Sequence, residues 1–291
     1  MTSNAPPNAL CQAVDAGRFV VAPGCYDALG ARLAEQHGFG AVYMSGLAVT
    51  ASLLARPDLE LLGMEEMVRQ ASLIVSAVDI PVIADADTGY GGLANVARTT
   101  QAYMQAGVAA IHLEDQASPK RCGHLGGVRL IDDAAMAAKL RVAVEARADG
   151  DMLIVGRTDG FKAESLDDAI RRANHYAGTG VDIIFVDGLT DPDDFKRVRQ
   201  EVEGRLMASV VEIDEPARTR AADLESMGYS IAIFALSGIL AAAGALDRLM
   251  AGISNDGDTD QSFESMTTYS DLNKALGIQG YNDLWNRYSA D

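Results

Sequence analysis

Short apolar runs alternate with amphipathic helical stretches along most of this 291-residue chain. Continuous runs of valine, isoleucine and leucine are typical of strands buried on both faces, as in a parallel sheet covered by helices. Strands are expected at residues 19–22, 41–45, 82–85, 110–113, 153–157, 183–186, 206–211 and 231–236. Helices are expected at residues 27–37, 64–78, 92–106, 132–147, 166–178, 192–202, 216–227 and 237–250. Eight such units in roughly 250 residues predict a closed (β/α)8 barrel. An open doubly wound sheet is the alternative, but no glycine fingerprint of dinucleotide binding follows the first strand.

The chain changes character after residue 252. A polar turn at residues 255–258 precedes two further helical stretches, around residues 262–276 and 280–289. Because these stretches lie beyond the eighth unit, we predict a barrel domain over residues 1–252 and a helical extension over residues 253–291. The extension needs a surface to pack against, and a neighbouring subunit is a plausible one.

Residues 230–246 form an almost uncharged run. The run is too short to cross a bilayer comfortably, and it lies inside the strand–helix alternation. We therefore predict a buried strand that leads into a buried helix, and no membrane span.

The chain is strongly acidic, with a net charge of -17. This charge argues against nucleic-acid and acidic membrane partners, although a metal or an arginine can still create a local site for a small anionic substrate. The cysteines Cys11, Cys25 and Cys122 are widely spaced, and the first residues lack the features of a signal peptide. We expect a reduced, cytoplasmic protein.

Ionisable residues crowd the expected carboxyl ends of the strands, which form the catalytic mouth of such barrels. They are Asp85, Asp87, Glu114, Asp115, Arg157, Asp159, Asp187 and Glu212. Any single aspartate here also fits a local capping role. Together, however, close carboxylates repel each other unless a cation lies among them, and oxygen ligands suit Mg2+. The set therefore predicts a magnesium site, and no histidine or cysteine spacing indicates zinc.

Cys122 lies between basic residues in the long connection 116–131. Neighbouring positive charge favours a thiolate, so this side chain is suited to proton transfer near neutral pH. Long strand-to-helix loops are often functional lids, and residues 47–63 form a second one. A structural, buried cysteine is the alternative, which the polar surroundings of Cys122 do not favour.

Arg157 ends the fifth expected strand and is suited to clamping a substrate carboxylate through two hydrogen bonds. The alternative is a salt bridge to one of the carboxylates at the mouth. Ser45 ends the second strand, where its hydroxyl and the following backbone N–H groups are placed to hold an anionic oxygen.

Four motifs in this order carry a family resemblance: Asp85-Ala86-Asp87-Thr88-Gly89-Tyr90-Gly91, His112-Leu113-Glu114-Asp115-Gln116, Lys120-Arg121-Cys122-Gly123-His124 and Gly156-Arg157-Thr158-Asp159. The chain resembles the isocitrate lyase/phosphoenolpyruvate mutase superfamily over nearly its whole length. The nearest branches are methylisocitrate lyase, dimethylmalate lyase and carboxyphosphonoenolpyruvate phosphonomutase.

The resemblance implies a role for each matching residue. The metal site for Mg2+, with Mn2+ as an alternative ion, corresponds to Asp85, Asp87 and Glu114. The catalytic residues correspond to Cys122 and His124 on a gating loop, Tyr43 as a second acid/base, and Arg157. The substrate contacts correspond to Ser45, Gly46, Leu47, Asp58, Lys120, Arg121, Gly123, Asp187, Ser209 and Val211. Members are usually homotetramers that exchange their terminal helices, which would give the extension its packing partner.

Four positions depart from the pattern of the lyases. Asp187 replaces a glutamate, Ser209 and Val211 replace polar residues that contact the substrate, and Leu47 replaces a small residue. The pocket is therefore expected to be more apolar than that of a tricarboxylate lyase, and to take a substrate with fewer carboxylates.

The resemblance implies a Mg2+-dependent retro-aldol cleavage of a 2-hydroxy dicarboxylate, such as a 2-alkylmalate or methylisocitrate, to an α-keto acid and a second carboxylic acid. Alternatives on the same scaffold are hydrolysis of oxaloacetate and phosphonomutase chemistry. A non-catalytic protein that binds keto acids is the remaining alternative, with support only from Asp187 and Ser209.

Overall fold

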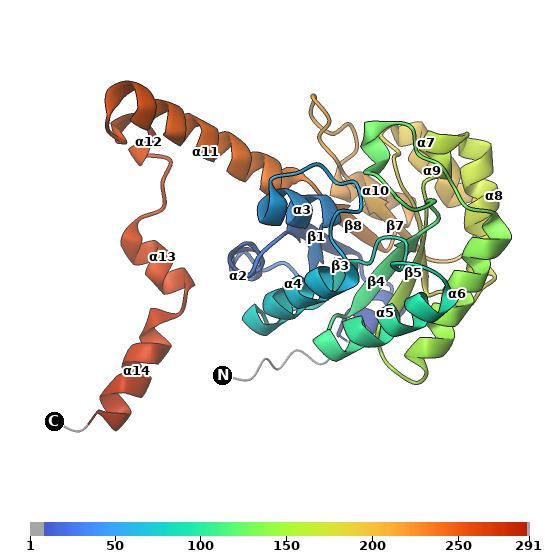
Figure 1. Cartoon of the computed structure of the whole chain (residues 1–291), viewed down its shortest axis with the longest axis horizontal. Coiled ribbons are helices and arrows are strands. Elements are labelled where there is room, and N and C mark those ends of the chain that lie inside the picture. The colour runs from blue at the N-terminus through green and yellow to red at the C-terminus, as the bar shows by residue number, and fades with distance from the viewer. Residues whose placement is uncertain (1–8, 290–291) are drawn as a thin grey trace.

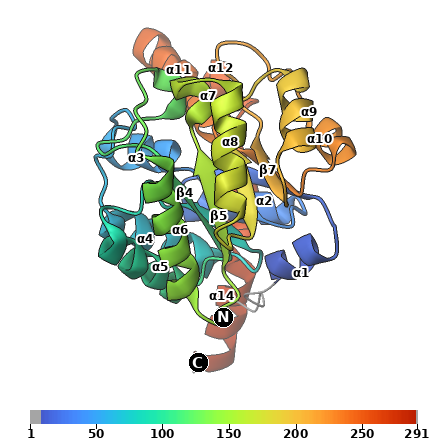
Figure 2. The same cartoon turned by 90° about the vertical axis from the view of Figure 1, so that its right-hand side faces the viewer.

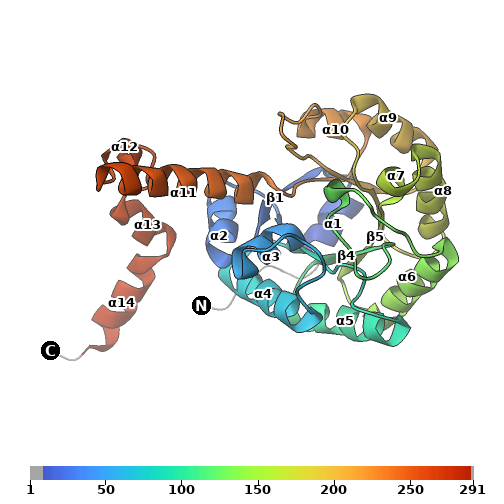
Figure 3. The same cartoon turned by 45° about the horizontal axis from the view of Figure 1, so that its top comes forward.

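Eight parallel strands close into a barrel in chain order, as the sequence predicts (Figure 3). The computed structural model describes residues 9–289, except for the side chain of His124. The first and last strands meet where Val20 pairs with Ile231. The strands are β1 Val20–Cys25, β2 Val42–Met44, β3 Val82–Asp85, β4 Ala110–Glu114, β5 Leu153–Thr158, β6 Ile183–Val186, β7 Leu206–Ser209 and β8 Ile231–Phe234.

Helices surround the barrel, and several begin at a residue suited to capping. The side chains of Asp27, Asp132, Ser165 and Asp191 each accept a hydrogen bond from a backbone N–H of the following helix, which satisfies a donor that the first turn leaves unpaired. The outer helices are α2 Ala28–Gln36, α4 Met64–Ala77, α5 Leu93–Ala106, α6 Asp133–Arg147, α8 Leu166–Ala177, α9 Pro192–Glu201 and α10 Ala221–Met227.

The core has two layers because successive side chains of a strand point to opposite sides. One layer lies between strands and helices, and the other fills the barrel interior. Helix α1 Ala9–Asp15 closes the end of the barrel away from the long loops (Figure 2) and buries Leu10 and Val14 against the interior layer. The remaining open end is the one where the strands finish.

Two short helices lie where the sequence indicated only loops. Helix α3 Gly46–Leu54 begins directly after β2, with Ser45 as its N-cap, and helix α7 Gly160–Ala163 follows β5. Helix α3 is apolar along most of its length, so it lacks the amphipathic period by which a helix is recognised in a sequence.

The C-terminal helices extend away from the barrel (Figure 1). They are α11 Ser237–Asp256, α12 Asp260–Phe263, α13 Tyr269–Ala275 and α14 Ile278–Tyr288. Helix α11 is continuous across residue 252, where the sequence indicated a domain boundary. Helix α13 returns to the barrel at α2, where Gln36 Nε2 donates to the carbonyl of Ala275 over 3.2 Å.

The prediction of a buried helix after β8 is wrong for this chain taken alone. The strand is buried, but α11 has no buried residue, and Leu240, Leu246 and Met250 are exposed. The reason is that α11 leaves the barrel surface instead of packing along it (Figure 1). None of the helices between residues 9 and 289 is both long enough and apolar enough to cross a bilayer.

Candidate active site

A cavity of about 40 Å³ lies at the carboxyl ends of the strands. Such a volume holds only a few water molecules. Most of the predicted site residues line it: Tyr43, Ser45, Leu47, Asp58, Asp85, Lys120, Cys122, Gly123, Arg157, Asp187, Ser209 and Val211. Gly46, Asp87, Glu114 and Arg121 are not part of its lining, and the side chain of His124 lies outside the described part of the structure.

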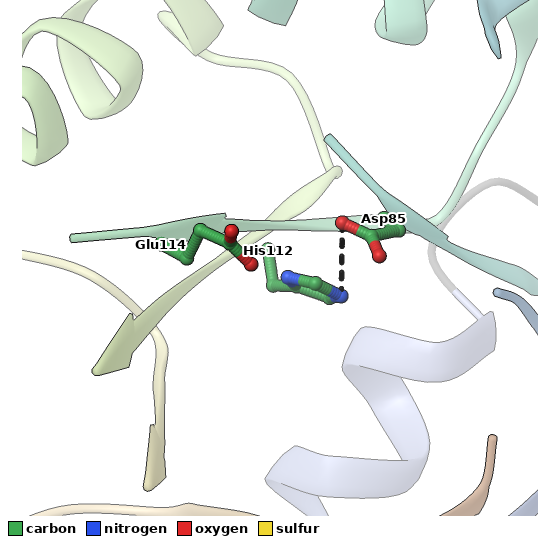
Figure 4. A group of neighbouring side chains, drawn as sticks. All are labelled: Asp85, His112 and Glu114. Atoms are coloured by element: carbon green, nitrogen blue, oxygen red, sulfur yellow. Dashed lines mark ion pairs between the residues drawn. The ribbon is translucent and has the colours of Figure 1, made fainter. Parts of the chain in front are cut away.

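The most compact group of metal-binding atoms belongs to Asp85, His112 and Glu114, whose ligand atoms lie within 4.8 Å of one another (Figure 4). Two of these residues were predicted as metal ligands. The third prediction, Asp87, has its Oδ1 2.6 Å from the ammonium of Lys120 instead. Glu114 Oε1 is buried without a hydrogen-bond partner among the described residues. An unpaired buried carboxylate oxygen beside a second carboxylate fits a hard divalent cation such as Mg2+.

Buried carboxyl groups outnumber buried cations at this mouth. Lys120 and Arg157 are surrounded by six carboxyl groups, those of Asp58, Asp85, Asp87, Glu114, Asp159 and Asp187. If all six were ionised, four negative charges would remain uncompensated in a region shielded from water. A divalent cation lowers that repulsion, which is a second reason why the residues fit Mg2+.

The pKa values of the carboxyl groups reflect this imbalance. Burial raises the pKa of Glu114 well above its usual value, and burial raises that of Asp87 to about 6 against the opposing charge of Lys120. For Asp85, burial is outweighed by His112, Lys120 and Arg157, and the pKa falls to about 2. Of Asp85, Asp87 and Glu114, Asp85 is therefore the one that is ionised most readily without a metal.

Arg157 binds three carboxylates at the mouth. Its Nε and Nη2 donate to Asp159 over 2.9 and 2.8 Å, and Nη2 also donates to Asp187 over 2.7 Å. Glu114 Oε2 lies 3.3 Å from Nε. The salt bridge between Arg157 and the carboxylates of the mouth, which was the alternative to a substrate contact, is thus formed. Arg157 also lines the cavity. A substrate carboxylate would reach Arg157 in competition with Asp187.

The two long loops meet over the mouth. Lys120 Nζ donates to Asp58 Oδ2 over 2.8 Å, and the backbone N–H of Cys122 donates to the Asp58 carbonyl over 3.1 Å. Glu60 accepts from the Ser118 hydroxyl over 2.6 Å and from the Lys120 N–H over 2.9 Å. These contacts hold the segment that carries Cys122 across the cavity. The role of Glu60 carried no signal in the sequence, because it is one glutamate in a polar loop.

Gly123 lies too close to the carboxylates for a larger residue. A Cβ atom there would lie 2.7 Å from Asp159 Oδ1 and 3.0 Å from Asp187 Oδ2. Next to it, Cys122 is partly buried and faces the cavity. Arg121 donates from its Nη1 to the Gly126 carbonyl over 2.8 Å and does not line the cavity.

Tyr43 and His112 form a buried polar pair beside the metal-binding group. The Tyr43 hydroxyl lies 2.8 Å from His112 Nε2, which in turn lies 3.5 Å from Asp85 Oδ1 (Figure 4). Burial raises the pKa of Tyr43 well above its usual value and lowers that of His112 to about 4. Both groups are therefore neutral near pH 7 and able to pass a proton between them. His112 belonged to a recognised motif, but its part in the site was missed.

One wall of the cavity is apolar. It consists of Leu47, Val211, Ile233, Ala235 and Leu236, with Ser209 as the polar group on that side. Leu47 and Val211, two of the positions that depart from the lyase pattern, are thus part of the cavity lining.

Comparison with known proteins supports the sequence resemblance. The family model described as phosphoenolpyruvate phosphomutase matches residues 11–254. A 2,3-dimethylmalate lyase from Eubacterium barkeri is 39% identical over 272 residues, which are 94% of each chain. A 2-methylisocitrate lyase from Shewanella oneidensis is 35% identical over 260 residues, which are 89% of each chain.

Solved structures show the same fold and related ligands. Oxaloacetate acetylhydrolase in complex with the inhibitor 3,3-difluorooxalacetate superimposes with a TM-score of 0.91 at 28% identity, over 100% of this chain and 99% of the other. Phosphonopyruvate hydrolase in complex with oxalate and Mg2+ superimposes with a TM-score of 0.87 at 30% identity, over 99% of both chains.

Replacing Gly46 by alanine is expected to weaken Mg2+ binding. A Cβ at Gly46 would lie 2.6 Å from Asp85 Oδ2, so the carboxylate must turn away, although the position is the first of helix α3 and accepts alanine otherwise. Titration calorimetry should show Mg2+ affinity reduced about tenfold or more. Gly92→Ala is the control, because a Cβ there meets nothing within 4 Å. Equal affinity in both variants would argue against Asp85 as a ligand.

Proposed function

Since the chain belongs to the phosphoenolpyruvate phosphomutase family, we propose that it is a Mg2+-dependent carbon–carbon lyase that cleaves an alkyl-substituted malate. The observation that carries this proposal is the position of Cys122, which faces a cavity that contains Arg157 and has an apolar wall. In 2,3-dimethylmalate, cleavage between the hydroxyl-bearing carbon and its substituted neighbour would yield pyruvate and propionate.

The residues fit the steps of such a reaction. Asp85 and Glu114 would hold Mg2+, or Mn2+ in its place, and the ion would lower the pKa of a substrate hydroxyl. Arg157 and the backbone after Ser45 would hold the carboxylate next to that hydroxyl. Tyr43 would receive the hydroxyl proton as the carbon–carbon bond breaks, and would pass its own phenol proton to Nε2 of the neutral His112. The Cys122 thiol would give its proton to the carbon that leaves with the bonding electrons.

The closed loops serve this chemistry by excluding water. A carbanion in contact with solvent would take its proton from water, without control of its position. The contacts of Asp58 and Glu60 with residues 118–122 hold this segment over the cavity. We expect the loops to open as substrate enters and to close again around it.

The substrate class follows from the charges that the cavity can offer. Both cations in its lining are already paired, Lys120 with Asp58 and Asp87. Arg157 is paired with Asp159 and Asp187, so a substrate carboxylate would reach it only by displacing Asp187. The apolar wall favours a methyl or ethyl group over a further carboxylate. These features support a 2-alkylmalate over methylisocitrate, which carries three carboxylates.

Hydrolysis of oxaloacetate is the second candidate. The likeness to oxaloacetate acetylhydrolase bound to a difluorinated oxaloacetate, with a TM-score of 0.91, favours it. The same metal and arginine would hold oxaloacetate. Water would attack the carbonyl carbon, and the bond from that carbon to the methylene carbon would break, giving oxalate and acetate.

A substrate screen distinguishes these candidates. Purified protein with Mg2+ should release an α-keto acid from 2,3-dimethylmalate or another 2-alkylmalate faster than from methylisocitrate, and a chelator should abolish the release. Absence of keto acid from all of these substrates would contradict the lyase proposal. Oxalate formed from oxaloacetate would support the second candidate instead.

Replacing Cys122 by serine should lower turnover at least about 100-fold, because a hydroxyl is a much weaker acid than a thiol. Binding of oxalate with Mg2+, measured by calorimetry, should stay within about threefold of the wild type. Cys11→Ser is the matched control, since Cys11 lies in α1 at the other end of the barrel. Full activity in Cys122→Ser would exclude the thiol as the proton donor.

We also propose that the extension packs on a neighbouring subunit in a homotetramer. Tyr281, Trp285 and Tyr288 lie on α14 and are 66%, 73% and 74% exposed in the single chain. Aromatic side chains this exposed are unfavourable in water and typical of interfaces.

Light scattering of the wild type should therefore give the mass of a tetramer. The double variant Tyr281→Ser/Trp285→Ser should give smaller species, because it removes apolar surface from the proposed contact. The variant Asn282→Ser/Asn286→Ser changes the same helix without removing apolar surface, and should keep the assembly. A monomeric wild type at micromolar concentration would contradict the proposal.

A further inference from the structure

Asp115 is fully buried directly after the Glu114 end of β4, yet it is not part of the cavity lining. Its Oδ2 accepts hydrogen bonds from the Thr158 hydroxyl over 2.7 Å and from the Tyr176 hydroxyl over 2.8 Å. Arg172 Nη1 lies 3.4 Å from the same oxygen. Burying a carboxylate is costly unless it is paired in this way. Two sets of contacts connect this buried carboxylate to the active site.

The first connection leads to Arg157. Asp115 Oδ1 accepts from the backbone N–H of Asp159 over 2.9 Å, at the end of β5. Asp159 then grips the Arg157 guanidinium through both of its carboxylate oxygens. Asp115 therefore fixes the backbone from which the partner of Arg157 projects.

The second connection leads to the base of the loop that carries Cys122. The Asp115 carbonyl accepts from the Ile131 N–H over 2.9 Å, and Ala117 N–H donates to the Arg129 carbonyl over 2.7 Å. Arg172 Nη1 donates to the Ile131 carbonyl over 3.1 Å. The Ile131 end of the loop is thus linked through Arg172 to the carboxylate that holds Asp159, and the Ala117–Arg129 bond joins the two sides of the loop.

We infer that Asp115, with Arg172 and Tyr176, is a positioning group that sets both Arg157 and the base of the Cys122 loop, and so the affinity of the site for a carboxylate. The inference rests on the proposed role of Arg157 in binding a substrate carboxylate. Asp115 itself touches neither the cavity nor the reacting atoms.

The structure offers a matched control at the other end of the same strand. Asp182 accepts from the Ile154 N–H over 2.7 Å and pairs with Arg147. It thus holds the start of β5 by an arginine and a backbone N–H, as Asp115 holds the end of that strand. Asp115→Asn and Asp182→Asn each remove a carboxylate charge that faces an arginine and a backbone N–H, Asp182 being the more exposed of the two, but only the first lies near Arg157.

The experiment compares both variants as full chains in oxalate binding with Mg2+ by calorimetry, and in urea unfolding. Both should be less stable than the wild type, but only Asp115→Asn should bind oxalate about tenfold or more weakly. The peptide that contains Cys122, followed by mass spectrometry, should also react faster with iodoacetamide in ligand-bound Asp115→Asn. Equal oxalate affinity in the two variants would overturn the inference.

A milder pair covers the case in which Asp115→Asn does not fold. Tyr176→Phe removes one hydrogen bond to Asp115, while Tyr229→Phe removes a buried bond from Tyr229 to the Phe195 carbonyl, 2.9 Å long. Oxalate affinity should fall about threefold in Tyr176→Phe alone, and equal affinity in the two would again overturn the inference. If the wild type binds no oxalate, the proposed function itself fails. If the wild type and both variants bind oxalate equally, only the present inference fails.

Discussion

The pairing of Arg157 and Lys120 with six buried carboxyl groups is the interaction on which the rest of the site depends. Each cation comes from a different part of the fold: Arg157 from the end of β5, and Lys120 from the loop that closes over the mouth. Five of the carboxylates lie at the ends of neighbouring strands and Asp58 lies in the loop before α4, so the two loops and the strand ends share one set of charges. Removing either cation would leave a buried negative charge without a partner, which is more costly than the loss of an exposed pair.

The architecture was predictable because it rests on periodicity. Each buried strand is a short apolar run, and the alternation of such runs with helices specifies the order of the barrel. Helix α3 was missed because its residues are apolar on all sides, and α11 was expected to be buried because its composition resembles that of a core helix. Composition shows that a helix needs an apolar partner, but it does not show whether that partner belongs to the same chain.

The site was predictable where strand ends converge and where motifs match, as at Asp85, Cys122 and Arg157. His112, Glu60 and Asp115 were not assigned functions, for different reasons. His112 alternates with Ile111 and Leu113 in β4 and therefore faces the interior, an argument the sequence allowed. The contacts of Glu60 and Asp115 join segments 16 to 61 residues apart in the chain, and no local pattern indicates them.

The position of Lys120 has a consequence for the energetics of the closed loop. Its ammonium contacts Asp87 and Asp58 while residues 116–131 lie across the mouth, so the proposed opening of this loop would take a positive charge out of the acidic interior. A cation held by Asp85 and Glu114 would reduce the repulsion among the same carboxylates that Lys120 reduces when the loop is closed. By thermodynamic reciprocity, whatever closure does to the free energy of ion binding, the ion does equally to the free energy of closure. The loop that carries Cys122 thus binds the barrel through the charge of Lys120, as a cationic ligand would.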